Sequence, residues 1–142
     1  KMSTRSNIII KNGKTNILLY RHCDGYLTGT GQDLLDDLSN SDFEKEPYFD
    51  NVAEYFNIAK FTEKLLNQDG NYRIDNQLGG DIEYLYTFDF ENSYEDARHY
   101  NRVKLKSIEV NQDVGFGRGG KRKFKTLSEF QDAINKERKE NE

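Results

Sequence analysis

An alternating stretch near the middle of the chain constrains the fold most strongly. Large apolar side chains occupy every second position from Ile82 to Phe90, with Glu83, Leu85, Thr87 and Asp89 between them. Because successive side chains of a strand point to opposite faces, these five apolar side chains share one face. Such a face is either buried core or an exposed platform on which nucleic-acid bases stack, and the platform would need basic neighbours. No basic side chain interrupts this face, so we predict a core strand packed against helices.

Two β-branched or apolar runs near the N-terminus predict a hairpin. The runs 7–11 and 14–20 are separated by Asn12-Gly13, a dipeptide typical of hairpin turns because both turn positions need a positive φ. The second strand, 17–20, leads directly into Arg21-His22-Cys23-Asp24. We therefore expect this polar cluster at the end of a strand, at the point where the rigid strand passes into a loop.

Apolar spacing indicates three helices. A short one follows the glycines at 32–38, and the longest is predicted over 50–67, with Gly70 available as its left-handed cap. The last begins at a capping box in which Thr126 is the N-cap and Glu129 reaches back. From about residue 136 the chain is almost wholly polar, and we expect a frayed tail there.

The strand predicted over 103–110 is irregular. Val103 and Leu105 are out of phase with Ile108 and Val110, and a bulge near Ser107 would restore the phase. Strands and helices do not alternate regularly along the chain, as they would in a doubly wound parallel sheet. We predict one α+β domain over 1–142, in which a mostly antiparallel sheet with an N-terminal hairpin is packed on one side by two or three helices.

Composition excludes several classes of protein. The net charge of −4 gives no overall attraction to nucleic acid, and a single cysteine excludes an internal disulfide framework. No apolar run reaches the ~18 residues of a membrane span, and the first residues contain no signal-peptide core, so we expect a soluble protein in the cytoplasm that does not contact a membrane. His22, His99 and Cys23 show no metal-ligand spacing. We expect no cofactor, and we interpret the carboxylates between 36 and 50 as a solvated loop, without deciding whether that loop mimics nucleic acid.

The polar cluster and the glycines after it form a candidate ligand loop. Backbone amides near Gly29 and Gly31, together with a helix start, can hold an anion, and Arg21 could add charge. The spacing of a dinucleotide fingerprint is absent, as is a P-loop lysine followed by Ser or Thr. The alternative is a glycine turn that only reverses the chain.

A second candidate is the one basic, glycine-rich stretch, over 114–125. Arg118 and Lys121 belong to a local positive patch that could meet phosphates, although an exposed hairpin connection has the same composition. The candidate ligand-binding residues are Arg21, His22, Asp24, Gly29, Gly31, Arg118 and Lys121. We assign no catalytic and no metal-binding residue.

Several of these motifs resemble a known family. Ser3-Thr4-Arg5-Ser6, the segment 20–26 and Gly29-Thr30-Gly31 are similar to a family of small, largely uncharacterised phage and prophage proteins, which begin Gly-Thr-Arg-Ser and carry His-Trp-Asp-Gly-Tyr-Pro. The likeness covers 3–38 and extends to 82–86, but Cys23 replaces the Trp and Leu27 the Pro. The resemblance implies a viral accessory protein in the interior of a host cell, but it indicates neither a catalysed reaction nor a ligand.

Three functions follow from these patterns. The first is a non-enzymatic accessory protein that blocks or remodels a host defence protein, and the second is a binder of a phosphate-bearing small molecule such as a nucleotide signal, through the loop 25–31. The third is a small hydrolase or nucleotide-processing enzyme with His22 and Asp24 as an acid/base pair and Cys23 as nucleophile. Strand alternation places Cys23 opposite the other two, so we favour a protein without catalytic activity. Nucleic acid is not favoured as the partner.

Overall fold

The computed structural model describes residues 4–41, 56–94, 101–114 and 120–141, although the side chains of 93, 94, 101 and 102 are not described. These residues form a six-stranded mixed sheet, three α-helices and one turn of π-helix, which confirms the α+β prediction. Several predictions fall outside the described residues, namely those on Asp42, Glu44, Glu46, Asp50, His99 and Arg118.

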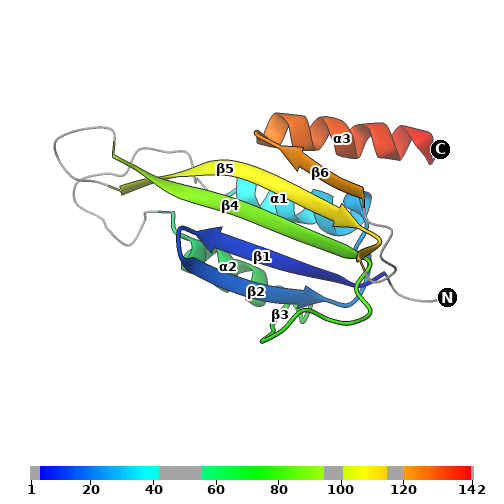
Figure 1. Ribbon diagram of the computed structural model, residues 1–142, viewed down its shortest axis with the longest axis horizontal. Coiled ribbons are helices and arrows are strands. Elements are labelled where there is room, and N and C mark those ends of the chain that lie inside the picture. Colours follow the sequence, from blue (N-terminus) through cyan, green and yellow to red (C-terminus); the bar gives the residue numbers. More distant parts are fainter. Residues whose placement is uncertain (1–3, 42–55, 95–100, 115–119, 142) are drawn as a thin grey trace.

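The sheet has the strand order β3-β2-β1-β4-β5-β6 (Figure 1). Its strands are β1 (Ser6–Asn12), β2 (Thr15–Arg21), β3 (Arg73–Ile74), β4 (Tyr84–Tyr94), β5 (Asn101–Gln112) and β6 (Gly120–Phe124). Every neighbouring pair is antiparallel except β1 with β4. The sheet is therefore mostly antiparallel, as predicted, and a single parallel contact joins the N-terminal hairpin to the central strand.

The hairpin is present, but its turn lies one residue later than Asn12-Gly13. Asn12 still pairs with Thr15, so the two turn residues are Gly13 and Lys14. Of these, only Gly13 has a positive φ, at 61°. Glycine in the first position of a two-residue turn is the arrangement that a type II′ turn requires.

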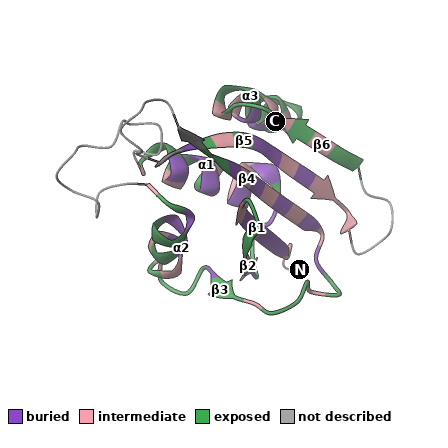
Figure 2. Ribbon diagram, turned by 60° about the vertical axis from the view of Figure 1, so that its left-hand side comes forward, coloured by how far each residue is buried: buried purple, intermediate pink, exposed green. Residues whose placement is uncertain are grey.

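The alternating strand supplies the core, as its pattern predicted. Tyr84, Tyr86, Phe88 and Phe90 are buried. The parallel register sets Ile8 beside Tyr86 and Ile10 beside Phe88, while β5 brings Ile108 and Val110 from the other side. Buried and half-buried residues alternate along the central strands in Figure 2.

The predicted irregularity in β5 is confirmed. Ser107 pairs with Asp89 and Leu105 pairs with Phe90, so Lys106 is the extra residue of a bulge. Inserting one residue brings Leu105 back to the face that Ile108 occupies.

All three α-helices lie on one side of the sheet (Figure 1). They are α1 (Gln32–Ser39), which continues the π-helix η1 (Leu27–Gly31), α2 (Ile58–Leu66) and α3 (Leu127–Glu140). Phe130 of α3 packs against Phe88 and Phe124, with ring centroids 6.2 and 5.4 Å away. In the described part of the chain, the other face of the sheet carries no helix. None of these helices is long and apolar enough to span a membrane.

Two helix boundaries differ from the prediction. α2 begins at Ile58 because the Asn57 side chain caps it by accepting from the Lys60 amide at 2.9 Å, and residues 50–55 lie outside the described part. α3 continues to Glu140 instead of fraying from about residue 136. The positive charges of Arg138 and Lys139 in its last turn interact favourably with the negative end of the helix dipole. Arg138 also donates to the Gln32 side chain of α1 at 3.3 Å.

The capping box of α3 is confirmed with one difference. The Glu129 amide donates to the Thr126 hydroxyl at 3.1 Å. The Glu129 carboxylate accepts from the amide of Lys125, the residue before the cap, at 2.8 Å.

Candidate functional site

Arg21, the predicted anion ligand, is a buried anchor at the end of β2. It is 8 % exposed, and its guanidinium lies 5.3 Å from the centre of the Tyr72 ring. Nη1 donates to the Tyr72 hydroxyl at 2.9 Å and contacts the Asp33 carboxylate at 2.8 Å, and Nε donates to the Cys23 carbonyl at 3.2 Å. The side chain thereby joins β2 to α1 and to the segment before β3.

Burial shapes the electrostatics of this anchor. Burial raises the pKa of Tyr72 to about 12, although the neighbouring Arg21 guanidinium acts in the opposite direction. Burial alone lowers the pKa of Arg21, but Tyr72 and Asp33 outweigh that effect and the pKa is raised. At neutral pH the anchor is therefore a guanidinium held by a neutral phenol and a carboxylate.

The backbone after Arg21 is fixed by its own hydrogen bonds. The Gly25 amide donates to the Thr4 carbonyl at 2.9 Å, and the Thr30 amide and hydroxyl both donate to the Asp24 carbonyl, at 2.7 and 2.8 Å. The amides of Gly29 and Gly31 donate to the Tyr26 carbonyl at 3.0 and 3.4 Å. The amides expected to hold an anion are thus engaged within the chain.

The glycines serve close packing of the chain against itself. A Cβ on Gly25 would stand 2.9 Å from the Thr4 carbonyl oxygen, and one on Gly29 would overlap the Asp24 carbonyl oxygen. A Cβ on Gly31 would make ordinary contacts, the nearest at 3.4 Å with Leu27. This pattern agrees with the alternative that the glycines shape a turn.

The side chains of residues 22–26, which we call the display loop, face solvent except at Gly25. Asp24 has a φ of 58°, and its carboxylate accepts from the Tyr26 hydroxyl at 2.8 Å. The Tyr20 hydroxyl and the His22 Nδ1 are 3.0 Å apart. His22 and Asp24 thus each contact a tyrosine, and these contacts differ from the acid/base pair of the enzyme hypothesis. Within the described residues, no three His, Cys, Asp or Glu side chains are grouped so that they could hold a metal ion.

Exposed apolar side chains occur on this loop and on segments near the same end of the sheet. Of the residues described, the large hydrophobic ones that are exposed are Tyr26 at 38 %, Ile74 at 61 % and Leu78 at 48 %. Ile74 pairs with Leu19 near the end of β2, and the segment of Leu78 is held there by a 2.8 Å bond from the Gly79 amide to the Asn7 side chain. We call His22, Tyr26, Arg73, Ile74 and Leu78 the β3 corner.

Sequence reasoning missed most of the β3 corner. Arg73 and Ile74 form a strand of only two residues, and the Arg73 guanidinium lies 4.5 Å from the centre of the Tyr20 ring. The run Tyr72-Arg73-Ile74 between Asn71 and Asp75 was the available signal. So short a run does not reveal that it pairs with β2.

The predicted ligand residues do not form one site. Lys121 lies on β6, and β1, β4 and β5 separate that strand from the Arg21 strand β2. Four strand spacings of about 4.8 Å put roughly 19 Å between them. Lys121 and Lys123 instead approach the Glu109 carboxylate, at 3.4 and 4.0 Å.

Comparison of the chain with models of known protein families, with curated proteins and with solved structures finds no match. The likeness to phage and prophage proteins therefore stays a prediction.

Proposed function

We propose that this protein acts by binding another protein through the β3 corner, without catalysis, as an accessory protein directed at a host protein. The observation that carries the proposal is that exposed Tyr26, Ile74 and Leu78 belong to segments that meet at one end of the sheet. Exposed apolar side chains that gather in this way mark interaction sites more often than isolated ones do.

The chemistry of the corner supports a protein partner. Tyrosine and arginine are the residue types most enriched where binding energy concentrates, and Tyr26, Tyr20 and Arg73 lie here. The hydrogen bonds that fix the display loop reduce the ordering entropy lost on binding. The anchor and the loop thus present a preformed surface.

The groups that suggested nucleotide binding already form contacts within the chain. The Arg21 guanidinium and the amides of Gly29 and Gly31 have intramolecular partners. A nucleotide would have to displace those partners.

Site-specific photo-crosslinking in host cells tests the proposal. A photoreactive phenylalanine analogue at Tyr26 or Ile74 should give one discrete crosslinked product. The same analogue at Lys60, which is exposed on α2, should give none. Equal products at all three positions, or none at Tyr26 and Ile74, would contradict the proposal.

A thermal-shift screen with mono-, di- and cyclic nucleotides tests the alternative. A ligand at ~100 times its dissociation constant adds about 2.7 kcal/mol to the free energy of unfolding. We expect no nucleotide to raise the Tm, and a rise that disappears in Gly29→Ala would favour the ligand loop.

A further inference from the structure

The opposite edge of the sheet is a second surface with its own chemistry. β6 is the last strand in the sheet order, and within the described residues no strand lies beyond it. All five of its residues are exposed or half-buried (Figure 2). An edge strand of this kind presents a row of backbone N–H and C=O groups to whatever approaches it.

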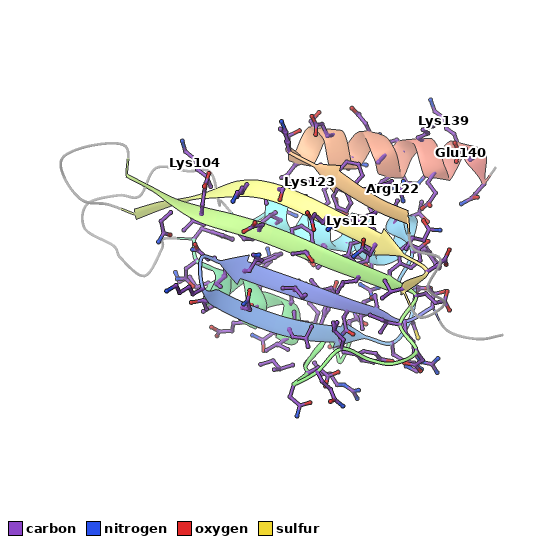
Figure 3. The ribbon with its side chains drawn as sticks, viewed as in Figure 1. Lys104, Lys121, Arg122, Lys123, Lys139 and Glu140 are labelled. Carbon is purple, nitrogen blue, oxygen red and sulfur yellow. The ribbon has the colours of Figure 1, made fainter. Side chains whose placement is uncertain are left out.

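The centre of β6 is basic on both faces. Lys121, Arg122 and Lys123 follow one another (Figure 3), and strand alternation places the two lysines on the face that carries no helix. Arg122 pairs with buried Val110 and so lies on the helix-covered face.

The two lysines share one carboxylate as their ion-pair partner. Lys121 and Lys123 are 61 % and 58 % exposed, and both approach the single carboxylate of Glu109. On the face that carries no helix, this edge therefore keeps a local excess of positive charge, although the chain as a whole carries a net charge of −4.

We propose that β6 accepts an extended acidic segment of a partner protein as a seventh strand. The incoming backbone would pair with the outer row of N–H and C=O groups. Its alternate side chains would stand beside Lys121 and Lys123 on one face and beside Arg122 on the other. Opposite charges placed directly across two strands stabilise the pair, which gives an acidic sequence its advantage.

The same charges exclude a second copy of this chain as the occupant. Pairing β6 with β6 would set three basic residues against three basic residues, and like charges across strands are destabilising. Edge lysines oppose such self-pairing in sheet proteins generally. They do not oppose a strand that carries glutamates or aspartates at the facing positions.

This surface is separate from the β3 corner. β3 and β6 are the two outer strands of the sheet, about five strand spacings or roughly 24 Å apart. A negative result for one of these two surfaces therefore does not count against the proposal for the other.

A short synthetic peptide tests the proposal on the full chain. The probe is a fluorescein-labelled peptide of about six residues, the length of a typical strand, in which glutamate and valine alternate. We expect saturable binding by fluorescence anisotropy, slower hydrogen exchange of amides in β6, and weaker binding as salt rises. The same peptide methylated at alternate backbone nitrogens keeps its charge but cannot complete the strand pairing, so it should not bind.

Matched variants locate the surface. Lys121→Glu with Lys123→Glu should weaken binding roughly tenfold or more, because two favourable cross-strand pairs become repulsive. Lys14→Glu with Lys60→Glu makes the same change in net charge at exposed positions away from β6 and should leave the affinity unchanged.

Several results would overturn the proposal. They are equal binding of the methylated peptide, equal binding of a peptide with lysine in place of glutamate, an equal loss in the control variant, and no binding of the acidic peptide. Tighter binding of a single-stranded oligonucleotide of the same charge, lost in the Lys121/Lys123 variant, would also overturn it in favour of nucleic acid.

Discussion

Arg21 and Lys121 were both predicted to meet an anion, and each contacts a carboxylate of the same chain, but one side chain is buried and the other is exposed. Arg21 is buried and directs its guanidinium to a phenol, a carboxylate and a carbonyl of the same chain. Lys121 is mostly exposed and shares the Glu109 carboxylate with Lys123. The comparison teaches that a basic side chain is available to a partner only if its N–H donors are not already bonded within the fold, or if the side chain is exposed to water.

The largest effect should come from removing the buried guanidinium. Arg21→Met leaves the buried Tyr72 hydroxyl without its donor and breaks the link to α1. We expect it to lower the free energy of unfolding by about 3 kcal/mol, measured by urea denaturation. A loss below about 1 kcal/mol would remove the distinction between the two basic sites.

The next largest effect should come from alanine at Gly29, and alanine at Gly31 should have a smaller one. Gly29→Ala places a Cβ against the Asp24 carbonyl oxygen, which is itself held by Thr30, and should destabilise the protein by about 2 kcal/mol. Gly31→Ala is the matched control, because its Cβ makes ordinary contacts, and it should change stability by less than about 1 kcal/mol. Equal thermal shifts for the two would contradict the packing role of Gly29.

Alkaline pH should remove the stabilisation that comes from the buried, neutral Tyr72 phenol of the anchor. The pKa of Tyr72 is about 12 in the folded protein, above its ordinary value of 10.0, so the folded state holds this proton more tightly than the unfolded state does. The resulting stabilisation is complete below pH 10 and is lost as pH rises from 10 to 12, by about 2 kcal/mol. The measurement is urea denaturation across this range.

Tyr72→Phe is the control for this pH dependence. It should be less stable at pH 7 and should lose less stability than the wild type between pH 10 and 12. Tyr84, whose pKa burial also raises to about 12, supplies a second, similar contribution that remains in the variant. An unchanged pH profile in Tyr72→Phe would show that Tyr72 does not titrate in this range.

The smallest effect should come from the exposed lysines. Lys121→Met and Lys123→Met should each change the free energy of unfolding by less than about 0.5 kcal/mol, because exposed ion pairs contribute little. Thermal denaturation at low and at high salt should barely separate the variants from the wild type. A loss comparable to that of Arg21→Met would mean that β6 is held by its charges.

Local patterns explain how much of the fold could be predicted. The hairpin, the apolar face of β4, the bulge at Lys106 and the Thr126 cap depend on residues a few positions apart, and those separations are visible in the chain. The start of α2 was placed too early because periodicity continues past a boundary that the Asn57 side chain sets.

The candidate site could be predicted only in part, for a physical reason. Arg21 and Asp24 do lie at the end of a strand, as expected. Whether Arg21 meets a ligand depends on Tyr72, which lies 51 residues further along the chain. No local pattern contains that contact.

The sequence alone determined the N-terminal hairpin, the apolar face of β4, the bulge in β5 and the cap of α3, because backbone propensity, side-chain alternation and capping act over a few residues. The tertiary structure alone decided that β1 lies parallel to β4, that Arg21 is enclosed while Lys121 is exposed, and that Tyr26, Ile74 and Leu78 lie on segments that meet at one end of the sheet. These are contacts between distant segments, and their free energy depends on burial and partners that exist only once the sheet has formed.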